Sequence, residues 1–202
     1  MSNSLYSVHI PANLRERLQT SLRLSRSPMT LGELGDLVQE YIIKCLKEPR
    51  LRAHFQAICK GEKIFGSVDY KTRHKVVLPD GRGVFVACAL DALVEDFFHQ
   101  IQIDSKCFHC GEPIRIRLSE GTINSAEPSS VVMWLGAGKE GDGPCRACLC
   151  PYINFFSSSE HVNEWKDKNP NEVGIMLTLS QSLELARKGY WNPLQLLQAR
   201  TS

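Results

Sequence analysis

The arrangement of cysteines constrains this chain of 202 residues more than any other feature of its sequence. Five of its eight cysteines fall between residues 107 and 150, and four of these form two C-x2-C pairs. Each pair lets two thiolates in one turn face the same ion, so two pairs can supply the four sulfurs of a tetrahedral zinc site. We therefore predict a structural Zn²⁺ bound by four thiolates, those of Cys107, Cys110, Cys145 and Cys148.

Other interpretations of the two pairs stay open. Thirty-four residues separate Cys110 from Cys145, which is more than in common zinc ribbons, so buried or incidental cysteines are the alternative. An iron atom or an iron–sulfur cluster is a second candidate occupant. His109 could replace a thiolate, although we expect an exposed turn residue there. Gly111, which follows the first pair, suits the positive φ that tight metal-binding turns often need.

Composition and charge exclude several classes of protein. Hydrophobic residues make up 43% and charged residues 23%, which excludes a disordered or fibrous chain. The net charge of +2 is too small to favour a nucleic-acid partner. No apolar run approaches the roughly 20 residues of a membrane helix, and the first residues lack the apolar core of a signal peptide. We expect a cytoplasmic protein without a membrane partner, whose thiols stay reduced.

The order of predicted elements indicates an α+β fold. Helices are predicted over 11–24, 31–44 and 49–60, with extended segments over 63–70 and 73–78, an order that resembles a winged-helix module. We therefore predict a helical domain over 1–78 and a mixed-sheet α+β domain over 79–202. The second domain is predicted to hold strands over 83–88, 100–106, 113–118, 130–135 and 174–179, and helices over 161–168 and 180–188, the last ended by Gly189.

Cys88 and Asp91 form a second candidate site. Cys88 ends a predicted strand, and Asp91 follows one helical turn later, so both side chains can face one point. The start of a helix favours a thiolate, and a neighbouring carboxylate can take up or deliver a proton. The residues alone leave a core cysteine and a helix-start aspartate as the alternative.

Three runs of sequence carry a resemblance to a known family. These runs are GRGVFVACALDALV, PIRIRLSEGTINSAEP and CPYINFFSSSEHVNEW. They resemble the alkylmercury (organomercurial) lyases over about residues 70–190, and the C-A-L-D string from Cys88 to Asp91 is the most specific part. The family's second active-site cysteine precedes a segment ending in paired phenylalanines, which here is matched by Cys150. The resemblance implies an alkylmercury-lyase-like domain over 79–202 after a winged-helix-like domain.

The resemblance also implies a mechanism. Cys88 and Cys150 would bind the mercury of a small organomercurial substrate, and Asp91 would protonate the departing carbon. The product ion, Hg²⁺, would remain on the two thiolates until small thiols or a mercuric reductase accept it. Our first hypothesis is therefore a carbon–mercury lyase that uses Cys88, Asp91 and Cys150.

The two C-x2-C pairs depart from the family pattern and keep other functions open. A divergent member with a structural zinc could act on another metal- or sulfur-containing substrate in a biosynthetic pathway. Cys148 could also replace Cys150 as the reactive thiol, which would break the four-sulfur site. A non-catalytic zinc scaffold is a further alternative. A metal-responsive DNA-binding regulator is another, although the predicted helix 31–44 is acidic, which disfavours phosphate contacts.

Overall fold

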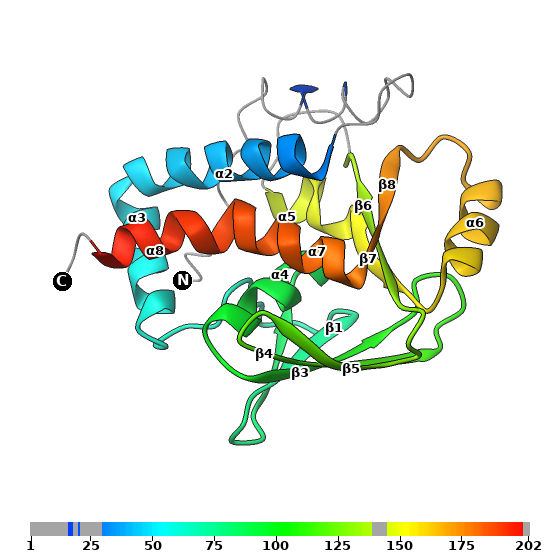
Figure 1. Ribbon diagram of the computed structural model, residues 1–202, viewed down its shortest axis with the longest axis horizontal. Coiled ribbons are helices and arrows are strands. Elements are labelled where there is room, and N and C mark those ends of the chain that lie inside the picture. The colour runs from blue at the N-terminus through cyan, green and yellow to red at the C-terminus, as the bar shows by residue number, and fades with distance from the viewer. Residues whose placement is uncertain (1–15, 18–19, 21–29, 139–144, 200–202) are drawn as a thin grey trace.

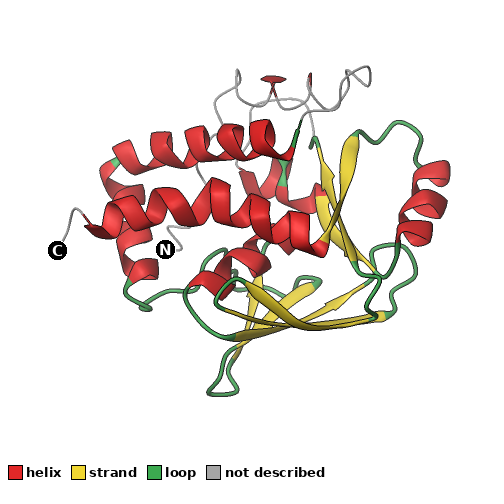
Figure 2. Ribbon diagram, viewed as in Figure 1, coloured by secondary structure: helices red, strands yellow, loops and turns green. Residues whose placement is uncertain are grey.

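A layer of helices packs against two antiparallel sheets in the computed structural model, which describes residues 16–17, 20, 30–138 and 145–199 (Figures 1 and 2). The α+β class predicted from the sequence is confirmed. Among the helices of these ranges, none is long and apolar enough to cross a membrane.

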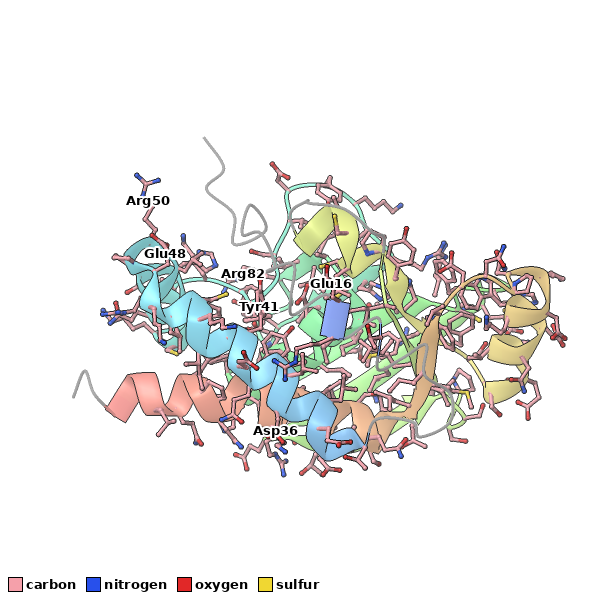
Figure 3. All side chains as sticks on the ribbon, turned by 90° about the horizontal axis from the view of Figure 1, so that it is seen from above. Glu16, Asp36, Tyr41, Glu48, Arg50 and Arg82 are labelled. Carbon is pink, nitrogen blue, oxygen red and sulfur yellow. The ribbon has the colours of Figure 1, made fainter. Side chains whose placement is uncertain are left out.

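The first two described helices form one side of the helical layer. Helix α2 (Leu31–Lys47) begins with a capping box, in which Thr30 and Glu33 each bond the other's backbone N–H. Helix α3 (Pro49–Cys59) follows at once, and the Glu48 side chain caps its start. Figure 3 shows Asp36 near the start of α2 and Glu48 at its junction with α3. These helices match the predictions for 31–44 and 49–60, whereas the helix predicted over 11–24 lies mostly outside the described residues.

The larger sheet has five strands in the order β2-β1-β3-β4-β5. Its strands are β1 (His74–Val77), β2 (Gly83–Val86), β3 (Ile101–Lys106), β4 (Pro113–Ser119) and β5 (Thr122–Glu127). Buried and exposed residues alternate along β4, because one face of the sheet packs on the core and the other faces solvent.

The sequence predictions differ from this sheet in three places. The segment 63–70 makes only an isolated bridge, from Ser67 to Val86, and is not a strand. Strand β5 was not predicted. The expected domain boundary after residue 78 falls between β1 and β2, which pair with each other. The winged-helix assignment of residues 1–78 stays a prediction.

The smaller sheet has three strands in the order β7-β6-β8, namely β6 (Val132–Gly136), β7 (Ile153–Phe156) and β8 (Gly174–Thr178). All residues of β6 and β7 are buried, because β6 is the central strand and β7 also packs on helix α4. Two short helical turns precede β7, α5 (Cys145–Cys148) and η3 (Cys150–Tyr152). Val132 of β6 pairs with Phe156, and Leu135 pairs with Ile153, so the two strands run in opposite directions.

The C-terminal helices do not end where the sequence suggested. Helix α6 (Ser159–Lys168) follows β7, and α7 (Leu179–Ala186) continues through a π-helical turn, η4 (Arg187–Trp191), into α8 (Asn192–Ala199). The prediction that Gly189 ends the helix is wrong. A Cβ atom at Gly189 would lie 2.5 Å from Cγ1 of Val38, so the glycine permits close packing against α2.

Helix α4 (Ala89–Val94) is the buried centre of the molecule. It lies between the larger sheet and the helical layer, and all six of its residues are buried (Figure 1). A helix that is covered on every side needs apolar residues on every side, which explains the sequence ALDALV. The exception is Asp91, and a short turn, η2 (Glu95–Phe97), continues the helix with two more buried carboxylates.

Candidate active site

Three residues singled out from the sequence meet in the core. The ligand atoms of Cys88, Asp91 and Cys150 all lie within 4.8 Å of one another. Their residues are only 2%, 5% and 4% exposed. Two sulfurs and one carboxylate at this separation can contact a single large ion, and the surrounding core excludes most water.

The turn between β2 and α4 positions the first two of these residues. Cys88 is the N-cap of α4, with extended backbone angles, and its Sγ accepts a hydrogen bond of 3.4 Å from the backbone N–H of Asp91. A cap of this kind fixes the rotamer of the thiol and directs it along the start of the helix. The one-turn spacing predicted from the sequence therefore corresponds to a real contact at the helix start.

A separate hydrogen bond holds the turn that carries Cys150. The Nδ2 of Asn154 donates to the carbonyl of Pro151 at 2.7 Å, and Asn154 is itself buried in β7. Cys150 opens the turn η3, which leads directly into β7. The pairing of β7 with β6 thus fixes where this turn can lie relative to α4.

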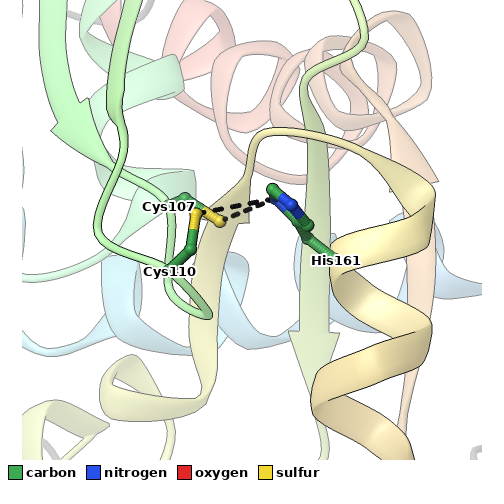
Figure 4. Close-up of side chains that lie close together, drawn as sticks. All are labelled: Cys107, Cys110 and His161. Atoms are coloured by element: carbon green, nitrogen blue, oxygen red, sulfur yellow. Dashed lines mark hydrogen bonds between the residues drawn. The ribbon is translucent and has the colours of Figure 1, made fainter.

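A second cluster of ligand-type side chains joins the β3–β4 turn to the start of α6. Cys107, Cys110 and His161 have ligand atoms within 4.8 Å of one another (Figure 4). The sulfurs of both cysteines lie 3.6 Å from Nδ1 of His161. The Oγ of Ser157 lies 2.8 Å from the same nitrogen and 4.0 Å from the Cys110 sulfur.

The two thiols of this cluster differ in acidity. Burial alone would raise the pKa of Cys107, but hydrogen bonds from the Ser157 hydroxyl and from backbone N–H groups stabilise its thiolate and lower its pKa to about 6. Desolvation and the neighbouring Cys107 thiol raise the pKa of Cys110. The pair therefore offers one thiolate readily at neutral pH.

Of the four predicted zinc ligands, the structure describes the side chains of three, and it places only Cys107 and Cys110 together. Cys107 and Cys110 contact the end of β7 near Ser157, whereas Cys148 lies before the start of β7, where its carbonyl approaches Gly138. Cys148 is not part of the cluster with His161. The side chain of Cys145 lies outside the described residues, so the four-cysteine set stays a prediction.

Two residues of the β3–β4 turn, Gly111 and His109, can be compared with the predictions made from the sequence. Gly111 has a φ of +80°, as the sequence suggested. His109 was expected to be exposed, but its side chain is only 15% exposed. Its Nε2 lies 3.0 Å from a Glu164 oxygen, and its ring centroid lies 5.6 Å from that of His161. Sequence reasoning missed His161, since it lies 51 positions after Cys110 and in no spacing motif.

One surface cavity lies away from both clusters. It has a volume of about 780 Å³ and contains none of the site residues predicted from the sequence. Its wall is formed by Gly121, Thr122, Ile123, Ser180, Leu183, Glu184, Arg187, Lys188 and Asn192.

Comparisons with known proteins agree on one family. The family model described as "MerB: Alkylmercury lyase" matches residues 69–190. Alkylmercury lyases of Bacillus cereus and Clostridium butyricum are each 32% identical over 110 residues, which is 54% of this chain and 49% of the relative. The chain spans about half the length of the curated relatives it matches. A solved structure titled the mercury-bound form of MerB2 is 21% identical, with a TM-score of 0.57, and covers 90% of this chain and 99% of that chain, which shows a shared fold.

Proposed function

Because the chain belongs to the alkylmercury lyase family, we propose that it cleaves the carbon–mercury bond of small organomercurials. The observation that carries this proposal is the convergence of two thiols and one carboxylate, from Cys88, Cys150 and Asp91, within 4.8 Å in the core. Thiolates are the preferred ligands of soft cations, and a carboxyl group beside them can move a proton.

The proposed reaction is a protonolysis. One thiol displaces the exchangeable ligand X of a compound R–Hg–X and passes its proton to the Asp91 carboxylate. The second thiol coordinates the mercury and releases its proton with X as HX. The carbon–mercury electron pair then takes the proton of Asp91, forming R–H and leaving mercury bound to both sulfurs. Overall, R–Hg–X and two thiols yield R–H, HX and a mercury bis-thiolate.

Each residue has a distinct role in this scheme. Cys88 and Cys150 bind mercury and raise the electron density on the departing carbon. Asp91 stores and delivers one proton, and the N–H of its own backbone holds the Cys88 sulfur beside it. The low exposure of these three residues favours the reaction, because little water can reach the site and take part in the proton transfer from Asp91.

The test is release of hydrocarbon from an aryl- or alkylmercury compound by the full chain with excess small thiol. We expect the wild-type chain and Cys59→Ala to turn over, and Cys88→Ala and Cys150→Ala to release no hydrocarbon above background. Cys59 is a matched control, because it is a partly buried thiol on α3 outside the cluster. Mercury capture by the wild-type chain without any hydrocarbon would contradict the lyase and favour a divergent activity on another metal- or sulfur-containing substrate.

The alternative of a DNA-binding regulator finds no support in α2. Its acidic side chains are engaged within the chain: Glu33 accepts from Thr30, Asp36 pairs with Lys188, and Glu40 pairs with Lys44. A recognition helix needs exposed basic or amide side chains for phosphates and base edges, and this surface is acidic.

A further inference from the structure

We propose that Cys107, Cys110 and His161 form a second metal site, which binds a zinc-class divalent ion separately from the mercury site. This proposal does not rest on the lyase activity. It differs from the four-cysteine prediction in its ligands, since a histidine of α6 takes the place of the second C-x2-C pair.

The two sulfur–nitrogen separations match the edges of a zinc tetrahedron, and the two sulfurs lie within 4.8 Å of each other. A Zn–S bond of about 2.3 Å and a Zn–N bond of about 2.0–2.1 Å at a tetrahedral angle place sulfur and nitrogen about 3.6 Å apart. Nδ1 of His161 lies 3.6 Å from each sulfur (Figure 4). A pair of thiolates that binds mercury in a line would instead hold its sulfurs on opposite sides of the ion, without a need for an imidazole.

Contacts with β7 and α6 hold the C-x2-C turn in place, and a cap at the start of α6 holds His161. The backbone N–H of Phe108, inside the C-x2-C turn, donates to the carbonyl of Phe155 at 2.9 Å, which fastens the turn to β7. The aromatic ring of Phe108 packs on Trp165 of α6, with 5.7 Å between ring centroids. Ser158 caps the backbone N–H of His161 at 3.4 Å. Neither side of the site therefore needs a large backbone movement to bind an ion.

Two oxygen-bearing side chains, those of Ser157 and Glu112, lie beside the three ligands. The Ser157 hydroxyl donates to Oε2 of Glu112 at 3.2 Å, and the same carboxylate oxygen lies 4.0 Å from Nδ1 of His161. When an ion binds Nδ1, it displaces the contact between His161 and Ser157. The fourth position of the tetrahedron is then open to the Glu112 carboxylate or to water.

The experiment measures metal binding by the full chain, not catalysis. The chain is purified with a reductant, stripped with a chelator, and titrated with Co²⁺ and then Zn²⁺. We expect one Co²⁺ per chain, with the intense visible bands of a tetrahedral ion and a thiolate charge-transfer band, all bleached by Zn²⁺. Cys107→Ser, Cys110→Ser and His161→Gln should weaken the apparent affinity by more than about 100-fold, since loss of supporting groups alone costs 10–100-fold.

Matched controls separate this site from its alternatives. His109→Gln lies in the same turn but outside the cluster, and Cys88→Ala removes the mercury site; both should retain one Zn²⁺ with unchanged affinity. His161→Cys should restore binding with a shifted charge-transfer band, which shows that a ligand and not folding was lost. Retention of metal by His161→Gln together with its loss in Cys148→Ser would overturn the proposal in favour of four thiolates. Absence of tetrahedral Co²⁺ bands in the wild-type chain would overturn it outright.

Discussion

The thiol of Cys88 and the carboxylate of Asp91 are held at the start of one buried helix, because the backbone N–H of Asp91 bonds the Cys88 sulfur at 3.4 Å. The two groups therefore share a single structural support, the first turn of α4, which is buried on all sides. A substitution at Asp91 can change proton transfer while the backbone bond to the sulfur remains. This separation allows binding and chemistry to be tested independently.

Asp91→Asn should capture mercury but fail to release hydrocarbon efficiently. The amide keeps the shape and the backbone bond to Cys88 but delivers no carboxyl proton, so turnover should fall by about 10²–10⁴-fold. Headspace gas chromatography of the hydrocarbon and mercury analysis of the desalted protein measure the two steps. Turnover within tenfold of wild type would show that another group supplies the proton.

Asn154→Asp should loosen the turn that carries Cys150. Asp has no N–H to donate to the Pro151 carbonyl, which now receives a 2.7 Å bond, so a buried acceptor loses its partner. We expect the free energy of unfolding in urea to fall by about 1–3 kcal/mol. Asn124→Asp is the control, because Asn124 is exposed and bonds only to Ser119 among the contacts described for it. Equal losses in the two variants would contradict the role of Asn154.

The stabilising contribution of protonated Glu95 should fall as pH rises from about 4.5 to about 7. Burial raises the pKa of Glu95 to about 7, although bonds from Phe65 and His99 oppose the shift. Between its unfolded and folded pKa values the native chain binds more protons than the unfolded chain, so unfolding becomes easier as pH increases. The loss attributable to this carboxyl is roughly 3 kcal/mol.

Urea titrations across this pH range test the dependence. Glu95→Gln should remove the contribution of this carboxyl, so the difference in the free energy of unfolding between the variant and the wild-type chain should change with pH across this range. The variant should keep a pH dependence from other buried groups. Burial raises the pKa of Asp96 to about 6, which acts in the same direction as Glu95. Burial lowers the pKa of His54 and His74 to about 4, which acts in the opposite direction. A slope identical to wild type in Glu95→Gln would assign the dependence to other groups.

Leu93→Ala should destabilise the fold strongly. Leu93 is fully buried on α4, between the sheet and the helical layer, so the smaller side chain leaves a cavity. We expect a loss of about 2–5 kcal/mol in the free energy of unfolding. Leu196→Ala is a suitable comparison, since Leu196 is 57% exposed and should cost much less. A similar loss for both would argue against α4 as the centre of the core.

Elements whose signals lie within a few neighbouring residues could be predicted from the sequence. The capping box at Thr30 and the alternation along β4 each specify an element without reference to the rest of the chain. Strand β5 was missed because its sequence, TINSAE, is mostly polar and sits at an edge of the sheet, where little apolar burial is required. Gly189 was misread because its role depends on Val38, a residue far away in the sequence.

Among the residues of the candidate sites, too, only those that are close in sequence could be placed together from their spacing. Asp91 lies one helical turn from Cys88, so their proximity follows from helix geometry. Cys150 entered through the family resemblance, since no spacing rule links it to α4. His161 reaches the C-x2-C turn only through the path of β7 into α6, and tertiary contacts of that kind leave no periodic signal.

Strand β7 sets the distance between the two groups of thiols. The Cys150 turn enters the strand at Ile153, and the contacts with Cys107 and Cys110 begin at its other end, about 10 Å away for a four-residue strand. A gap of that length is too wide for one ion, so under our two proposals each cluster would bind and release its ion independently. Inorganic mercury left after the proposed reaction and the proposed ion at the β3–β4 turn would therefore exchange separately, although cysteines of the same chain would bind both.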